Sequence, residues 1–275
     1  MLNIHKLLLL LQVISGPECS PSAHNNACIV AYYLTIDQGN SEAKIALWDD
    51  SELEDFRMEP ALNPQRVSDF VGGRSLAGGI YCSVAREDVD VIRRMCHLCP
   101  RAVRLTPDTP VPIRVDYRTP TTLGADRVAA AVGAWGDFGG RPILVVDAGT
   151  AVTYDYVDAE GVYHGGNIAP GISMELRALH EFTARLPLVP FPEDMPSLCR
   201  ELFGRDTREA IALGAVNSVV ASIYYYRSKL PHDTVVVLGG GCGHHLASVC
   251  DFETRVDEHL VSKGLNRILL YNETL

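Results

Sequence analysis

Residues 34–47 read LTIDQGNSEAKIAL, and residues 144–157 read LVVDAGTAVTYDYV. Each stretch is an apolar run with strand propensity, then Asp-x-Gly and a polar residue, then a second run of the same kind. The two aspartates, Asp37 and Asp147, are separated by about the length of one small domain. A single Asp-x-Gly is common in ordinary β-turns. Its repetition with matching flanks favours a functional pair of hairpins over two unrelated turns.

The chemistry of this pair suits a nucleotide. A strand that ends in Asp before a glycine turn places a carboxylate beside free backbone N–H groups, so the carboxylate can face a cation and the amides a polyphosphate. A third stretch, TVVVLGGGCG at Thr234–Gly243, places glycines directly after a buried strand, where a flat ligand can approach the backbone. A dinucleotide fold would need G-x-G-x-x-G in its first βα unit, and this run lies near the C-terminus.

These three stretches resemble the phosphate-1, phosphate-2 and adenosine elements of the sugar kinase/Hsp70/actin superfamily. The resemblance implies an α/β protein of two ribonuclease-H-like (actin-like ATPase) domains facing a central cleft. We expect the domains to span 29–138 and 139–275. The residue pattern predicts the following elements: helices at 63–71, 87–96, 125–135, 172–183 and 208–227, and strands at 79–83, 103–105, 163–171 and 235–238.

Composition narrows the class of protein. The chain has 275 residues, is 47% hydrophobic and 21% charged, and carries a net charge of −10 without a lysine or arginine block. This balance is typical of a globular protein and argues against a nucleic-acid partner. Eight scattered cysteines show no disulfide spacing, which favours a cytoplasmic location.

The N-terminal segment does not fit the expected fold. Lys6 and the apolar run 7–14 resemble a short signal peptide, with Cys19 as a lipoprotein-like site, yet the run is too short to span a bilayer. We interpret residues 1–28 as an artefactual or upstream-start extension outside the fold, in preference to a working export signal, and expect no membrane partner. Removal of residues 1–27 should then leave activity intact.

Other Cys and His residues that could bind a metal or take part in catalysis have simpler interpretations. The C-x-x-C at Cys96 and Cys99 has neither a second zinc-type pair nor a thioredoxin-like setting, so we interpret both as incidental cysteines at a helix end. His244 and His245 are interpreted as turn or helix-start residues, and the sequence assigns no role to His180.

Further stretches specify a family. They are DQGNSEAK (37–44), LGADR (123–127), DAGT (147–150), GGNIAPG (165–171), FTARLP (182–187) and KGL (263–265). Together they resemble type III pantothenate kinase, from about Ile29 to the C-terminus. The resemblance implies ATP-dependent phosphorylation of pantothenate to 4'-phosphopantothenate, the first step of coenzyme A biosynthesis. Ser41 stands where this family usually has Thr, which preserves the hydroxyl.

The first hairpin supplies the expected ATP site. Asp37 would face Mg²⁺ bound with ATP, and Lys44 would reach the β- and γ-phosphates, although a lysine on a strand can also simply be solvated. The predicted ATP-binding residues are Asp37, Gln38, Gly39, Asn40, Ser41, Glu42, Ala43, Lys44 and Thr150. The resemblance assigns Asp147 to a monovalent cation, K⁺ or NH₄⁺, although a second contact to Mg²⁺ is equally compatible with the sequence.

The acceptor site follows from the resemblance. Asp126 is assigned as the general base for the primary hydroxyl of pantothenate, while the alternative is an N-cap of the following helix. Arg127 can pair with the substrate carboxylate. The predicted substrate-binding residues are Tyr117, Gly124, Ala125, Asp126, Arg127 and Thr207. Without the resemblance, the sequence favours Thr207 as an ordinary residue at the start of a helix.

The sequence also bears on the oligomeric state of the protein and leaves two alternative functions open. The strongly apolar helix 208–227 is either deeply buried or part of an interface, and the resemblance implies a two-fold homodimer in which Thr207 completes the partner's pocket. The alternatives are another kinase of the superfamily, acting on a sugar or N-acyl sugar, and a non-catalytic regulator that retains the nucleotide fold.

Overall fold

The two Asp-x-Gly stretches fold as antiparallel hairpins in two different sheets. In the computed structural model, which describes residues 31–84 and 87–275, β1 (Tyr32–Gln38) pairs with β2 (Ala43–Asp49). Likewise β7 (Ile143–Ala148) pairs with β8 (Ala151–Val157). The predicted extension 1–28 lies outside the described residues, so the interpretation of that segment stays a prediction.

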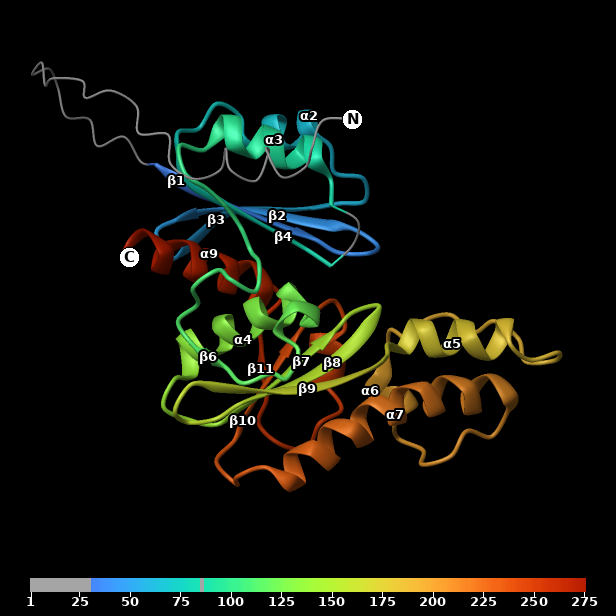
Figure 1. Ribbon diagram of the computed structural model, residues 1–275. Coiled ribbons are helices and arrows are strands. Elements are labelled where there is room, and N and C mark those ends of the chain that lie inside the picture. The colour runs from blue at the N-terminus through green and yellow to red at the C-terminus, as the bar shows by residue number, and fades with distance from the viewer. Residues whose placement is uncertain (1–30, 85–86) are drawn as a thin grey trace, which may run out of the picture. The chain divides into compact units, whose positions relative to one another are not determined.

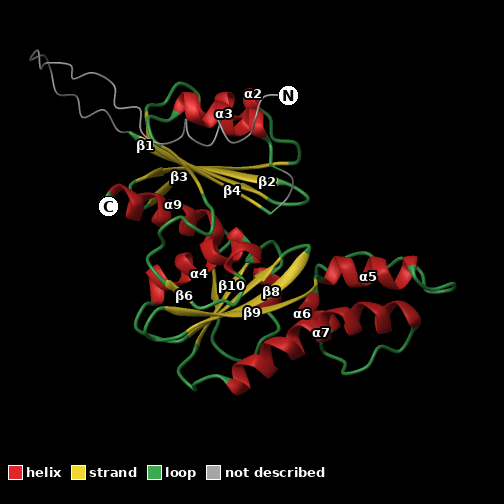
Figure 2. Cartoon of the chain, in the orientation of Figure 1, coloured by secondary structure: helices red, strands yellow, loops and turns green. Residues whose placement is uncertain are grey.

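The first sheet has the strand order β3-β2-β1-β4-β5, with β3 at Glu52–Glu59, β4 at Leu76–Ser83 and β5 at Ala102–Arg104. Two helices, α2 (Pro64–Val71) and α3 (Val89–Leu98), cover one face of this sheet (Figure 2). Local signals fix both helix starts, because the side chains of Asn63 and Asp88 accept N-terminal backbone N–H groups.

The second sheet has the order β11-β10-β7-β8-β9-β6. Its remaining strands are β6 (Arg114–Val115), β9 (Val162–Pro170), β10 (Val235–Gly239) and β11 (Arg255–Val256). Alternate residues of β7 enter two cores, since Val145 packs with α4 (Ala125–Phe138) and Val146 packs with helices of the opposite face. The helices of that opposite face are α5 (Ile172–Glu181), α6 (Met195–Leu198), α7 (Thr207–Lys229) and α8 (Gly243–Ala247).

The C-terminal helix α9 (Leu260–Glu273) joins the two sheets through packing. It lies between α4 and the first sheet, as Figure 1 shows. Its crossing with α4 needs glycine, because a Cβ on Gly264 would lie 1.8 Å from the carbonyl oxygen of Ala129. Asn266 Nδ2 donates to the Asp50 carbonyl oxygen at 2.6 Å, and Tyr33 Oη donates to Glu273 at 2.8 Å. Residues 31–275 form one compact unit, and the boundary at 138/139 stays a prediction.

Most predicted elements are confirmed within a few residues, but the strands β3, β6 and β11 and the helices α6 and α9 were not predicted. The β3 sequence ELEDFRME is acidic and has no β-branched residue, so its strand propensity is weak. Burial explains most of the apolar surface of α7, because Ile211, Val216, Val219 and Ile223 are buried within the chain. Among the described residues, no helix is long and apolar enough to cross a membrane.

Candidate active site

The turns of the two hairpins meet although they are distant in sequence. Ser41 Oγ, in the β1–β2 turn, lies 3.1 Å from Thr150 Oγ1, in the β7–β8 turn. Asp37 pairs in register with Lys44, and Asp147 with both Thr153 and Gly239. Both aspartates therefore stand near strand ends, beside glycine turns, as the repeated pattern predicts.

A cavity of about 520 Å³ lies at this meeting point. We call it the main cavity. Its walls come from both hairpins, α4, α5 and the glycine turn after β10. The lining residues are Asp37, Gly39, Asn40, Ser41, Glu42, Lys44, Val84, Asp126, Asp147, Ala148, Gly149, Thr150, Ala151, Thr153, Ser173, Met174, Arg177, Gly240, Gly241 and Cys242. The volume is in the range of a small-molecule or nucleotide pocket.

The carboxylates of Asp37, Asp126, Asp147 and the turn residue Glu42 line this cavity together with the Lys44 ammonium group. Asp37 is 8% exposed, and its Oδ1 atom has no hydrogen-bond partner among the described residues. Burial raises the pKa of Asp37 from 3.8 to about 7; Lys44 lowers this pKa, whereas Asp126 and Asp147 raise it. Burial also raises the pKa of Asp126 and of Asp147. The cavity therefore favours a bound cation, which would relieve both the desolvation and the repulsion of these carboxylates.

Asp126 lies in the first turn of α4 but is not its N-cap. Gly124 occupies the N-cap position, and Asp126 Oδ1 accepts the backbone N–H of Arg127 at 2.8 Å. A Cβ on Gly124 would lie 2.6 Å from Asp126 Oδ1, so the Asp126 carboxylate can occupy this position only because residue 124 has no side chain. The N-cap alternative is thus wrong, and the Asp126 carboxylate lines the main cavity.

Arg127 is not among the residues that line the main cavity and instead forms a buried ion pair. Its Nε and Nη2 atoms contact Asp155 Oδ1 at 3.0 and 2.5 Å, and the two side chains are 5% and 0% exposed. Tyr163 Oη donates to the same Asp155 oxygen at 2.7 Å, and the Arg127 guanidinium carbon lies 6.0 Å from the centroid of the Tyr117 ring. Two predicted substrate residues, Tyr117 and Arg127, are therefore neighbours, but Asp155 already pairs with the arginine.

Other predicted residues lie outside the walls of the main cavity. Gln38 accepts a hydrogen bond from Tyr81 Oη at 3.3 Å, and Ala43 is buried beside it in β2. Ala125 lines a separate, mostly apolar pocket of about 210 Å³. Thr207 is the exposed first residue of α7, and Asp206 provides the helix cap. Within one chain, Thr207 is a helix-start residue.

Several lining residues were not predicted. Ser173, Met174 and Arg177 come from α5, where the sequence gives no sign of which helix face meets the cavity. The GGNIAPG stretch immediately before α5 was the available signal, since it ends at the N-cap residue Gly171. Cys96 lies in α3 and Cys99 at its C-cap. His244 and His245 lie in the short helix α8, in contact with Glu258 and Glu193 respectively.

Comparisons with known proteins agree on one family. The family model described as type III pantothenate kinase matches residues 33–229 of this chain. A type III pantothenate kinase from Porphyromonas gingivalis is 38% identical over 248 residues, covering 88% of this chain and all of the relative.

Solved structures show the fold. A Campylobacter jejuni protein assigned to the Baf family of transcriptional activators has a TM-score of 0.58 at 24% identity and covers 88% of this chain and all of its own. A Sinorhizobium meliloti protein described as a 2-dehydro-3-deoxygalactonokinase has a TM-score of 0.56 at 14% identity, covering 89% of this chain and all of its own. The expected sugar kinase and actin-like fold class is confirmed. The chain belongs to the type III pantothenate kinase family.

Proposed function

We propose that this protein transfers the γ-phosphoryl group of ATP to the primary hydroxyl of pantothenate, giving 4'-phosphopantothenate in the first step of coenzyme A biosynthesis. Family membership supports this activity. The structural observation that carries the proposal is the convergence of Asp37, Lys44, Asp126 and Asp147 on one cavity. Phosphoryl transfer depends chiefly on charge neutralisation and positioning, which such a set of groups can provide.

The triphosphate would lie between the two hairpin turns. Backbone N–H groups of the turns and the hydroxyls of Ser41 and Thr150 are suited to its oxygens, and the Lys44 ammonium is suited to the β- and γ-phosphates. The short distance between Ser41 and Thr150 supports one ligand touching both turns. The exposed Arg177, also on the cavity wall, adds a second cation.

The carboxylates fit a divalent cation shared with the phosphates. Within residues 31–84 and 87–275, no group of three or more Asp, Glu, His or Cys side chains could hold a metal alone. Mg²⁺ typically takes one or two carboxylates plus phosphate oxygens, and the unpartnered Asp37 Oδ1 provides such a ligand. A bound Mg²⁺ would offset the phosphate charge. Asp147, in the second hairpin, would hold K⁺ or NH₄⁺.

Asp126 would orient the acceptor. Its carboxylate faces the main cavity from the start of α4, and burial raises its pKa. The ionised form of an acid with a raised pKa is a better proton acceptor. Asp126 would accept a hydrogen bond from the pantothenate hydroxyl and take its proton as the bond to phosphorus forms.

The rest of the acceptor would extend toward Tyr117 and Arg127, beside Gly124 and Ala125. We infer a cytoplasmic homodimer in which Thr207 of each chain completes the partner's pocket. The segment before Thr207 supports an interface, because Leu202 and Phe203 are 74% and 77% exposed.

The test is turnover by the purified chain with Mg²⁺-ATP and K⁺. ADP release and the mass of the product should be followed with pantothenate, a panel of sugars and N-acyl sugars, and no acceptor. We expect pantothenate-dependent ADP release and a product heavier by one phosphoryl group. Turnover of sugars alone would favour a different kinase, and no turnover with any acceptor would favour a regulator.

A further inference from the structure

Thr153, on β8, lines the main cavity and has no role in the phosphate, cation or acceptor contacts described above. Its hydroxyl oxygen Oγ1 is buried and has no hydrogen-bond partner among the described residues. Because an unpaired hydroxyl is costly to bury, such a group in the wall of a cavity is expected to find its partner in the bound ligand.

The strand register gives the position of Thr153 relative to the predicted site residues. Asp155, on β8, pairs with Arg127 in the first turn of α4. Thr153 is the next residue on the same face of β8, about 7 Å from Asp155 along the strand. It also lies directly opposite Asp147 of β7. Thr153 therefore lies between the carboxylate of the second hairpin and the first turn of α4, which carries Asp126.

The two carboxylates nearest to Thr153 in this arrangement are directed to other groups. Asp126 Oδ1 accepts the backbone N–H of Arg127 at 2.8 Å. Asp147 Oδ1 lies toward the turn after β10, since a Cβ on Gly240 would be only 2.6 Å from it. The Thr153 hydroxyl is therefore available to a ligand in the main cavity.

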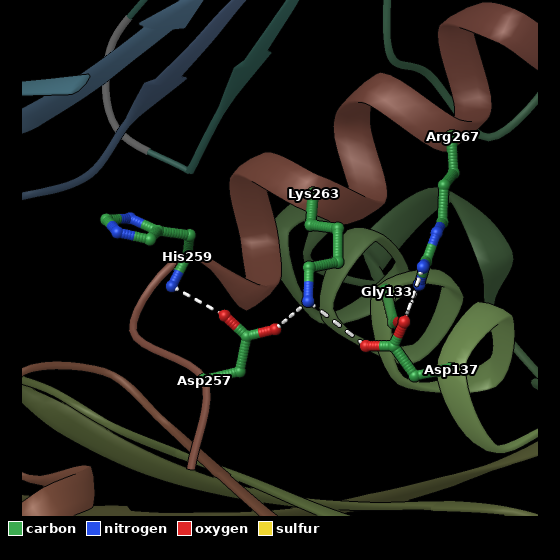
Figure 3. Close-up of polar contacts among 6 residues, drawn as sticks. All are labelled: Gly133, Asp137, Asp257, His259, Lys263 and Arg267. Atoms are coloured by element: carbon green, nitrogen blue, oxygen red, sulfur yellow. Dashed lines mark hydrogen bonds and ion pairs between the residues drawn. The ribbon is translucent and has the colours of Figure 1, made fainter. Parts of the chain in front are cut away.

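Both ends of α4 are held in place, which fixes the spacing between Asp126 and Thr153. The buried ion pair described above ties the start of α4 to β8. Near the other end of the helix, Asp137 contacts Lys263 Nζ at 3.1 Å and Arg267 Nη2 at 2.5 Å, both from α9, as Figure 3 shows. Two hydrogen-bonding groups at a fixed spacing can select a ligand by the distance between its own polar groups.

The proposed acceptor has two hydroxyls close together. In pantothenate a single carbon separates the carbon of the reacting primary hydroxyl from the carbon of the secondary hydroxyl. We propose that Thr153 Oγ1 hydrogen-bonds the secondary hydroxyl while Asp126 holds the primary one, so that the site selects a 1,3-diol. This assignment rests on the proposed function, because it takes pantothenate as the acceptor. Thr153 would then be a specificity-determining residue, since a site that hydrogen-bonds a substrate hydroxyl discriminates against an analogue that lacks it.

The experiment compares two acceptors in the purified enzyme with Mg²⁺-ATP. They are pantothenate and its deoxy analogue, in which hydrogen replaces the secondary hydroxyl, tested as a substrate and as a competitive inhibitor. Thr153→Val removes the hydroxyl and keeps the branched shape, whereas Thr153→Ser keeps the hydroxyl. Tyr154→Phe is the matched control, because it removes a hydroxyl from the adjacent residue, which is 3% exposed and packs in the core on the other face of β8.

Folding is checked by urea unfolding of the unliganded variants. Thr153→Val removes a hydroxyl that has no partner in the described part of the chain, so its free energy of unfolding should not fall below that of wild type. Thr153→Ser provides a second folded variant in which the proposed hydrogen bond is retained.

We expect Thr153→Val to lower kcat/KM for pantothenate by about 10-fold, with the KM for ATP and the binding of the deoxy analogue unchanged. Thr153→Ser should retain most of the preference for pantothenate over the deoxy analogue, and Tyr154→Phe should retain all of it. An equal loss with both acceptors, a change in the KM for ATP alone, or an unchanged preference in Thr153→Val would each overturn the assignment. A wild-type protein that does not turn over pantothenate would instead count against the proposed function.

Discussion

The raised pKa of Asp37 predicts that the unliganded protein loses stability as the pH rises from 5 to 8. Burial places this pKa at about 7 in the folded chain against 3.8 as its ordinary value. The folded state therefore binds more protons than the unfolded state between these two values, and the free energy of unfolding falls with pH in that range. The contribution of Asp37 protonation to the free energy of unfolding is fully present below about pH 4 and is lost as the pH rises through about 7.

The size of the effect follows from the same two values. A rise from 3.8 to about 7 corresponds to about 4 kcal/mol over the full range, of which about 2.5 kcal/mol falls between pH 5 and pH 8. Asp37→Asn removes this titration while keeping the size of the side chain. The free energy of unfolding of Asp37→Asn minus that of wild type should therefore grow by about 2.5 kcal/mol from pH 5 to pH 8.

Urea unfolding at pH 5, 6, 7 and 8, without nucleotide, measures this difference directly. Subtracting the wild-type curve removes the contributions of groups that are unchanged by the substitution. Mg²⁺-ATP should bind wild type more tightly as the pH rises through 7, since a cation selects the ionised carboxylate. A free-energy difference that stays constant across the four pH values would show that Asp37 titrates normally and would refute the reasoning.

Four further predictions concern catalysis. Asp126→Asn should lower kcat by at least about 100-fold with ATP binding intact; an unchanged kcat would remove Asp126 from the mechanism. Gly124→Ala should also lower kcat, because its Cβ would lie 2.6 Å from Asp126 Oδ1, and normal turnover would show that the carboxylate position is not critical. Asp155→Asn should reduce the preference for pantothenate over pantothenol, which lacks the carboxylate, because Asp155 holds Arg127; an equal loss with both acceptors would indicate a structural pair only. Mixing inactive Asp126→Asn and Thr207→Arg subunits should restore some activity, and subunit exchange without recovery would place both residues in one chain's pocket.

The local parts of the site were predictable from sequence. Asp-x-Gly between two strand-forming runs specifies a hairpin through turn chemistry over a few residues. The placement of Asp37 near a strand end, and of Ser41 and Thr150 in the turns, could therefore be predicted directly. The resemblance to a family added the order of these elements along the chain and the assignment of Asp126 as the candidate general base. The burial of α7 could be stated only as one of two alternatives, because periodicity gives the amount of apolar surface and not what covers it.

Long-range packing decided the rest. Asp155 lies 28 residues from Arg127 in the chain, and only the pairing of β8 and β9 beneath α4 makes it a buried partner. The charged strand β3 has weak propensity of its own, and its pairing with β2 brings Met58 level with Lys44. The sequence by itself determined which residues can turn, accept a proton or hold a phosphate, since these are properties of short segments. The tertiary structure decided which of them share a cavity and which are neutralised by a neighbour, because burial and charge pairing arise only when distant segments pack together.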